Sequence, residues 1–202
     1  LTQSALARLA QTDRTIVRDS QRDICMSNSV IILAAGKGTR MESDLPKVLH
    51  RLAGAPILLH VMKSSATLEP EKLIIVAGHG AAAVGVVALD YDETAEIVLQ
   101  SEQLGTGHAV SQAKSALAGC TGDVIILYGD TPFVRPETLQ SLSAARKTAD
   151  IVVLGFNAGD PGRYGRLVMQ GAAVSRIVEY KDASEQERAI TFCNSGGNLC
   201  QS

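Results

Sequence analysis

Apolar residues in this chain occur in short runs, separated by stretches in which they recur at helical spacing. The runs, which we predict as strands, cover residues 30–33, 72–77, 96–100, 123–130 and 150–156. The stretches predicted as helices cover residues 56–66, 81–90, 106–118 and 136–149. A continuous apolar run is typical of a strand buried on both faces, and alternating strands and helices favour parallel pairing. We therefore expect an α/β fold with a doubly wound, mostly parallel sheet.

The pattern changes near both ends of the chain. Residues 1–25 are mostly polar, and we expect a poorly ordered extension that precedes a domain over residues 26–202. Residues 163–170 and 173–180 are predicted as two short strands joined by a turn at Gly171. The last six residues, GNLCQS, do not continue a recognisable strand.

The amino-acid composition of the chain narrows the classes of molecule that it could bind. The 202 residues carry a formal net charge of −2, so no general basic field attracts nucleic acid, and 3% aromatic residues are too few for a base-stacking platform. No apolar run approaches the ~20 residues that span a bilayer. The four cysteines are scattered without C-x-x-C spacing, which argues against zinc and indicates reduced thiols in a cytoplasmic protein. A small anionic molecule is the expected ligand.

The first strand, residues 30–33, runs directly into a loop of small residues at 34–38. Small side chains let a ligand approach the backbone, and glycine permits turns that aim successive N–H groups at one anion. Positive charge surrounds this loop at Lys37, Arg40 and Lys47. The Walker motif is absent, and Met41 occupies the third glycine position of the dinucleotide motif. A plain turn with solvated lysines is the alternative, but cations beside a strand end favour a phosphate site.

A second glycine-containing loop follows the third strand, in the segment SEQLGTGHAV at residues 101–110. Gln100 and Gln103 flank it, and an amide offers the donor and the acceptor that a uracil edge requires. The alternative is a turn in which Thr106 caps the following helix. That alternative explains the glycines but not the two amides.

Asp130 lies where the fourth strand ends, in the segment YGDTP at residues 128–132. Ligands of open α/β sheets bind at the carboxyl ends of the strands, and Mg²⁺ prefers carboxylate and phosphate oxygens. Asp130 is therefore a candidate Mg²⁺ ligand. The alternative is that it caps the helix opened by Pro136, but a residue nearer the proline suits that role better.

Several motifs now occur together and in order: LAAGKGTRM, LPKVL, QSEQLGTGHA, GDTP and IVEYKDA. This set resembles the signature of the sugar-phosphate nucleotidyltransferases. The similarity is greatest to the uridylyltransferase domain of the bacterial bifunctional N-acetylglucosamine-1-phosphate uridylyltransferase/glucosamine-1-phosphate acetyltransferases, from about residue 28 to about residue 196. The resemblance implies a Rossmann-like nucleotide-diphospho-sugar transferase fold with a small β sugar-binding insertion. It also implies an Mg²⁺-dependent reaction of UTP with N-acetylglucosamine 1-phosphate that yields UDP-N-acetylglucosamine and pyrophosphate.

The resemblance assigns roles to individual residues. Arg40 and Lys47 would be catalytic cations that neutralise phosphate charge, and Asp130 would be the metal ligand. The substrate would also contact Leu33, Ala34, Ala35, Gly36, Lys37, Gly38, Thr39, Tyr128 and Gly129.

For the uridine base, the resemblance implies contacts from Gln100 and Gly105, with Thr106 beside them. For the sugar, it implies a subsite of Gly165, Glu179 and Asn194. One departure from the family pattern is Arg163, which stands where the family has a glycine before the tyrosine.

The resemblance also implies that the domain continues past residue 202, where the family has an asparagine as second metal ligand. A left-handed β-helix acetyltransferase domain would follow, and full-length family members form homotrimers largely through that domain. The 202 residues of this chain contain no hexapeptide repeat, the sequence pattern of such a β-helix. Two alternatives remain open. One is another sugar-phosphate or MobA-like nucleotidyltransferase with a different base or acceptor, and the other is a nucleotide-binding fragment without activity.

Overall fold

The structure is a computed structural model that describes residues 28–36, 38 and 41–201. The predicted extension at residues 1–25 lies outside this part. The large sheet contains β1 (Asn28–Ala34), β4 (Lys72–Ala77), β5 (Glu96–Leu99), β6 (Asp123–Tyr128), β7 (Ile151–Asn157), β8 (Arg166–Gln170), β9 (Ala173–Val178) and β10 (Phe192–Gln201). A separate small pair is formed by β2 (Arg51–Leu52) and β3 (Ala55–Pro56). The helices are η2 (Lys47–Leu49, 3₁₀), α1 (Ile57–Ala66), α2 (Ala81–Tyr91), α3 (Thr106–Gln112), α4 (Pro136–Arg146) and α5 (Glu185–Arg188).

The sheet runs in the order β5-β4-β1-β6-β10, and its first four strands are parallel. In the shared register, Leu33 of β1 lies opposite Val76 of β4 and Tyr128 of β6. The chain moves outward from β1 to β4 and β5 and then returns to β6 on the other side of β1. This reversal makes the gap between β1 and β6 the topological switch point of the sheet, where open α/β folds bind ligands. The predicted doubly wound, mostly parallel α/β fold is confirmed.

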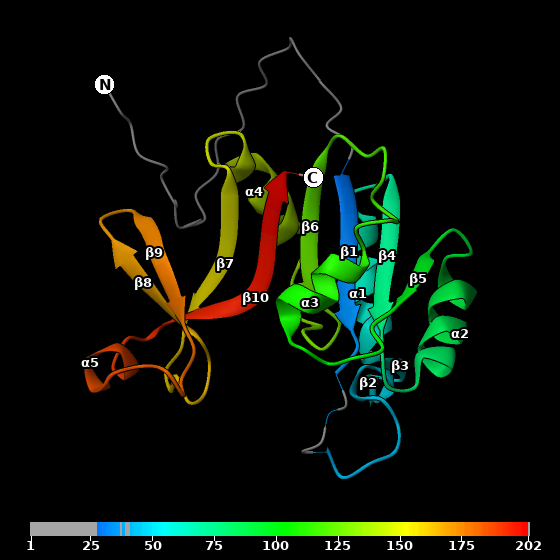
Figure 1. Cartoon of the computed structure of the whole chain (residues 1–202), viewed down its shortest axis with the longest axis horizontal. Coiled ribbons are helices and arrows are strands. Elements are labelled where there is room, and N and C mark those ends of the chain that lie inside the picture. The colour runs from blue at the N-terminus through cyan, green and yellow to red at the C-terminus, as the bar shows by residue number, and fades with distance from the viewer. Residues whose placement is uncertain (1–27, 37, 39–40, 202) are drawn as a thin grey trace.

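Helices cover both faces of the parallel strands (Figure 1). On one face α1, α2 and α4 pack over Val30 and Ile32, and on the other α3 packs over Ile31. Because neighbouring residues of β1 face opposite sides, all three are fully buried. This explains why β1 is continuously apolar, with no alternation between apolar and polar residues.

The strands β8 and β9 form a hairpin that stands apart from the parallel strands and joins them through β10 (Figure 1). β10 pairs antiparallel with both β6 and β7, so the expectation that the last residues form no strand is wrong. The run Ser195-Gly196-Gly197 has low strand propensity and coincides with a register shift between Asn194 and Asn198. Pairing on both sides and the complete burial of Leu199 hold the strand in place despite this sequence.

Two local predictions also need correction. The helix that begins at Thr106 ends at Gln112, with turns continuing the chain toward Ala118. Thr106 is the first residue of this helix; its N-cap is Gly105, and no side chain caps it. By contrast, Pro136 begins α4 as expected, since its fixed φ suits the first helical turn.

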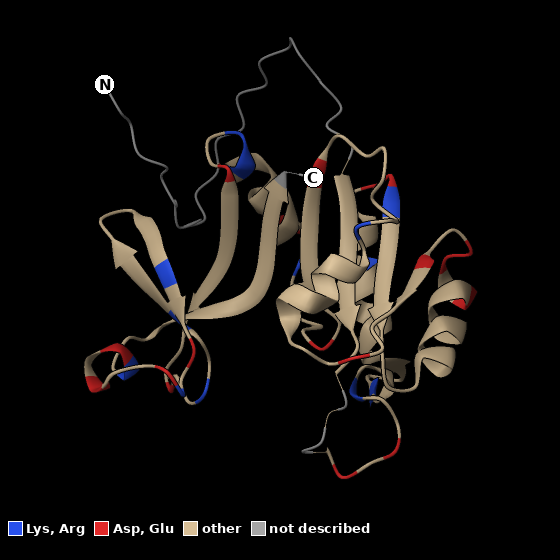
Figure 2. Ribbon diagram, viewed as in Figure 1, with Lys and Arg blue, Asp and Glu red and all other residues tan. Residues whose placement is uncertain are grey.

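Charged positions are interspersed by sign in the loops and at the strand ends (Figure 2). Throughout the described residues, no helix combines the length and apolar content that a membrane crossing requires.

Candidate active site

A pocket of about 370 Å³ opens where β1 and β6 end, at the switch point of the sheet. Its volume falls in the range of small-molecule sites. Nine residues singled out from the sequence line it: Leu33, Ala35, Gly36, Lys47, Gln100, Gly105, Thr106, Tyr128 and Asp130. Gln103, noted in the sequence as the second amide of the loop at residues 101–110, lines it too, as do Val48 and Ala109, which sequence reasoning did not place in the site.

The two strand ends are held together at the floor of the pocket. The Gly129 N–H donates to the Leu33 carbonyl at 2.9 Å. A Cβ at Gly129 would lie 3.1 Å from this same oxygen and 3.2 Å from Val48 Cγ1, closer than most side chains tolerate. Glycine therefore lets the end of β6 pass against both β1 and η2. Ala34, also predicted to bind substrate, is buried in the core beneath this floor.

The loop after β1 crosses directly over Lys47. Gly38 has a φ of +61°, and a Cβ there would lie only 2.7 Å from Lys47 Cβ. The Met41 N–H donates back to the Gly38 carbonyl at 2.8 Å. Lys37, Thr39 and Arg40 lie outside the described residues, so the predicted nest of N–H groups and the role of Arg40 remain predictions.

Lys47 and Asp130 form an ion pair inside the pocket. Lys47 Nζ donates to Asp130 Oδ2 at 2.6 Å, and the two side chains are 41% and 31% exposed. The buried side chains of Val48 and Leu49 anchor η2 against the core, which places the preceding lysine at the strand end. The alternative that Asp130 caps α4 is wrong, because the N-cap of that helix is Arg135.

The donor set suits Mg²⁺ only together with a phosphate ligand. Asp130 is the one carboxylate that lines this pocket, and the described residues contain no group of three or more His, Cys, Asp or Glu that could hold a metal ion. Mg²⁺ typically keeps several waters and binds one or two carboxylates plus substrate phosphates, so a single aspartate in a pocket large enough for a phosphate-bearing ligand fits it.

The amides at the other end of the pocket are fixed by internal hydrogen bonds. Gln100 is 4% exposed; its Nε2 donates to the Gly105 carbonyl at 3.2 Å and lies 3.1 Å from His108 Nδ1. Gln103 Nε2 donates to the Ala35 carbonyl at 2.7 Å and so ties this loop to the end of β1. Gly105 has a φ of +104°, a conformation that favours glycine. These bonds tie the loop to the start of α3 and to the end of β1.

The Tyr128 side chain spans the pocket. Its hydroxyl donates to Thr106 Oγ1 at 3.4 Å. Its ring packs against Gly196, which has a φ of +87° and where any Cβ would collide with the ring. The Gly196 N–H donates to Asn194 Oδ1 at 3.0 Å. Tyr128 thus links the residues expected near the base to those expected near the sugar.

The three residues of the implied sugar subsite lie close together: Gly165 directly precedes β8, Glu179 directly follows β9, and Asn194 belongs to β10. The Asn194 N–H donates to the Gly165 carbonyl at 2.8 Å. A Cβ on Gly165 would lie 3.2 Å from Glu179 Oε1, so the glutamate side chain covers the glycine. The structure therefore brings together Gly165, Glu179 and Asn194, which are far apart in the sequence.

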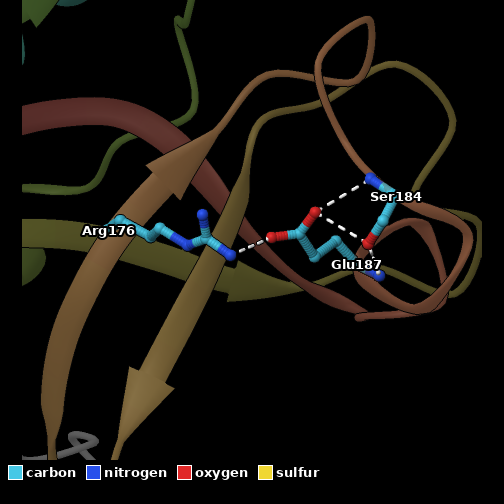
Figure 3. Close-up of polar contacts among 3 residues, drawn as sticks. All are labelled: Arg176, Ser184 and Glu187. Carbon is cyan, nitrogen blue, oxygen red and sulfur yellow. Dashed lines mark hydrogen bonds and ion pairs between the residues drawn. The ribbon is translucent and has the colours of Figure 1, made fainter.

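A short helix, α5, supports the hairpin beyond the sugar subsite. Ser184 and Glu187 form a capping box, and Glu187 also pairs with Arg176 of β9 (Figure 3). The main-chain and side-chain hydrogen bonds from Ser184, followed by the charge of Arg176, lower the pKa of Glu187 below its ordinary value. This carboxylate fastens α5 to the hairpin.

Comparison with known proteins agrees with this geometry. The bifunctional protein GlmU of Ruegeria pomeroyi is 65% identical over 175 residues, which cover 87% of this chain and 39% of that protein. GlmU of Roseobacter denitrificans is 63% identical over the same shares of the two chains. The chain thus spans about two fifths of the length of these curated relatives.

Solved structures share the fold at low sequence identity. An apo UDP-glucose pyrophosphorylase matches with a TM-score of 0.71 and 18% identity, over 87% of this chain and 77% of that one. The inositol-1-phosphate CTP transferase of T. maritima matches with a TM-score of 0.68 and 18% identity, over 87% and 71%. The sequence pattern of the MobA-like NTP transferase domain matches residues 30–193. Since this match covers most of the chain, the chain belongs to the MobA-like NTP transferase family of nucleotidyltransferases.

Proposed function

We propose that this chain transfers a uridylyl group from UTP to N-acetylglucosamine 1-phosphate, with Mg²⁺, to give UDP-N-acetylglucosamine and pyrophosphate. The family membership and the relatives named GlmU support nucleotidyl transfer, and the motif resemblance supports this base and this sugar. The observation that carries the proposal is the 2.6 Å contact between Lys47 Nζ and Asp130 Oδ2. This contact joins a cation and a candidate metal ligand inside the pocket. The two amides of the second glycine-containing loop, Gln100 and Gln103, line the other end of that pocket.

Both substrates are polyanions, so their mutual repulsion is the first obstacle to reaction. In the proposed mechanism, a phosphate oxygen of the sugar phosphate attacks the α-phosphorus of UTP, in line with the departing pyrophosphate. Positioning and charge neutralisation would supply most of the catalysis. Lys47 would neutralise charge that grows on the α-phosphate, and Arg40 with the N–H groups of residues 36–39 would hold the β- and γ-phosphates. When bound, Mg²⁺ on Asp130 would offset charge on the α-phosphate and the incoming phosphate.

The base would bind between the second loop and the end of β1. Gln100 is already held by Gly105 and His108, and the loop is held by Gln103, so little ordering would remain to be done on binding. A pyrimidine suits this place because one edge of the base meets the amide while Ala35 and Gly36 leave room for its face. We propose that the reaction takes place in the cytoplasm.

A pyrophosphate-release assay tests the proposal on the 202-residue chain. With UTP, N-acetylglucosamine 1-phosphate and Mg²⁺ we expect release, and with CTP, ATP or GTP in place of UTP we expect little. Lys47→Ala should lower turnover by about 10²-fold or more, the scale of losing one preorganised donor. Lys63→Ala is the matched control, since it removes an exposed lysine of α1 outside the pocket. UTP binding without pyrophosphate release, or equal loss in both variants, would contradict the proposal.

A further inference from the structure

A row of three paired residues, one each from β8, β9 and β10, lies next to the sugar subsite. In the register of the sheet, Arg166 of β8 lies opposite Val178 of β9 on one side and Cys193 of β10 on the other. Next to this row lie the residues of the implied subsite: Gly165 directly before β8, Glu179 directly after β9, and Asn194 in β10. Arg166 is therefore the central residue of the row that supports this subsite.

Arg166 is buried, being 2% exposed, and main-chain carbonyls surround its guanidinium group. Its Nη1 donates to the carbonyls of Pro161 at 3.3 Å and Tyr164, and its Nη2 donates to those of Gly162 at 3.1 Å and Arg188 at 3.3 Å. Three of these four acceptors belong to the loop that leads into Gly165, and the fourth lies at the end of α5. A single side chain thus fixes both segments.

Arg166 also contacts the residue that follows Glu179. Its guanidinium carbon lies 5.7 Å from the ring centre of Tyr180, and that of Arg188 lies 4.7 Å from the same ring. A guanidinium group over the face of an aromatic ring is attracted by the ring quadrupole, so Arg166 helps to hold the Tyr180 ring in place. Arg166 therefore restrains the chain on either side of the subsite, before Gly165 and after Glu179.

The charge of Arg166 has no carboxylate partner among the residues that the structure describes. A buried cation is costly unless its donors are satisfied; here carbonyl oxygens accept hydrogen bonds from both Nη atoms, whereas the buried Nε has no partner among the described residues. Successive residues of a strand face opposite sides of the sheet, so the Arg166 side chain points away from the face that Gly165 presents. It cannot touch a ligand on that face, and any influence on the ligand has to pass through the backbone.

We propose that Arg166 is the positioning residue of the sugar subsite, an inference that rests on the proposed function. Its planar fork holds the loop at residues 161–164 and the end of α5, and its face lies against the Tyr180 ring that follows Glu179. Together these contacts keep Gly165, Glu179 and Asn194 in line for the sugar phosphate. Lysine cannot replace it, because one ammonium group cannot reach four carbonyls in two segments. The nucleotide pocket at β1 and β6 does not depend on it.

Two substitutions of Arg166 test this inference in the 202-residue chain. Arg166→Met keeps the length of the side chain and removes all donors, and Arg166→Lys keeps the charge without the fork. Gln170→Met is the control: Gln170 is the last residue of the same strand, β8, and its side chain is exposed. The readouts are the KM for each substrate, the affinity for UTP by calorimetry, and amide hydrogen exchange.

For Arg166→Met we expect the KM for the sugar phosphate to rise about 10- to 100-fold, since a shift of ~1 Å can cost about 10²-fold. UTP affinity should stay unchanged, and amides of residues 161–165 and 179–182 should exchange faster than in the parent. The KM of Arg166→Lys for the sugar phosphate should lie between the values for the parent and for Arg166→Met. The control variant should have the KM values of the parent for both substrates.

Three results for Arg166→Met would overturn the inference. They are equal changes in the KM of both substrates, an unchanged KM for the sugar phosphate, and unchanged amide exchange in residues 161–165 and 179–182. Failure of both Arg166 variants to fold would also overturn it, since Arg166 would then support the whole domain. If the parent released no pyrophosphate, the proposed function would fail separately; exchange in the loop and direct binding of N-acetylglucosamine 1-phosphate would still decide the role of Arg166.

Discussion

Lys47 Nζ and Asp130 Oδ2 lie 2.6 Å apart, although the residues are separated by 83 positions in the chain. Each side chain is about one third exposed or more, so water screens the pair and its net contribution to stability is small, at ~0–1 kcal/mol. A pair held this weakly can exchange partners. Phosphate oxygens can take Lys47 while a cation takes Asp130, and the same two residues would then serve the bound state.

Asp130→Asn should remove most Mg²⁺-dependent activity and leave the fold intact. The amide is a poorer ligand for a hard cation, whereas the lost ion pair contributes little to stability. Titration of pyrophosphate release with Mg²⁺ and a thermal melt of the same sample measure the two effects. A variant with normal activity, or a parent indifferent to added Mg²⁺, would contradict the metal role.

Gly165→Ala should weaken binding of the sugar phosphate. The added Cβ would lie 3.2 Å from Glu179 Oε1 and would push the carboxylate from its place. We expect the KM for the sugar phosphate to rise by about tenfold or more, with UTP binding unchanged. Gly159→Ala is the matched control in the same region, because a Cβ there meets no atom within 4 Å. The prediction fails if the two alanine variants behave alike.

Gln100→Ala should reduce discrimination between UTP and other nucleotides. The variant removes the buried amide that Gly105 and His108 hold in place. A site that selects its ligand by hydrogen bonds loses selectivity when the side chain that makes those bonds is removed. Rates of pyrophosphate release for UTP and CTP, compared as kcat/KM ratios, measure the change. An unaltered ratio would show that the base is selected elsewhere.

Glu187 should make the stability of the chain depend on pH in the acid range. Its pKa is lowered in the folded state, chiefly by hydrogen bonds from Ser184, relative to an ordinary value of 4.5. The carboxylate therefore stabilises the fold above about pH 4.5, and this contribution is lost as the pH falls through the lowered pKa. Glu187→Gln should be less stable than the parent at pH 7, with the difference shrinking at lower pH.

Denaturant unfolding of both proteins between neutral and acid pH checks this prediction. A difference that stays constant over the whole range would mean that ionisation of Glu187 plays no part.

The sequence predicted the parallel strands and the helices between them because their apolar patterns are strong. The runs at residues 72–77 and 123–128 are continuous and buried, and tertiary packing agrees with local propensity there. β10 was missed because Ser195-Gly196-Gly197 has little strand propensity, and only pairing with β6 and β7 makes it a strand. A cap at Thr106 was wrong because Gly105, with its positive φ, takes the N-cap position.

For the site, the motifs identified the pocket residues, but the contacts between them depend on the fold. Nothing local indicates that Gln103 reaches the Ala35 carbonyl, 68 positions away, or that Val48 packs on Gly129. The support from Arg166 was also missed, since an arginine at the start of a short strand is ordinarily exposed. Its burial follows from the loop that folds back over it.

The most direct test of this account is a crystal structure of the chain with UDP-N-acetylglucosamine and Mg²⁺. The account predicts uracil beside Gln100 and Gly105, the diphosphate near Lys47 and Asp130, and the sugar over Gly165, Glu179 and Asn194. Density for the nucleotide away from the carboxyl ends of β1 and β6 would contradict it.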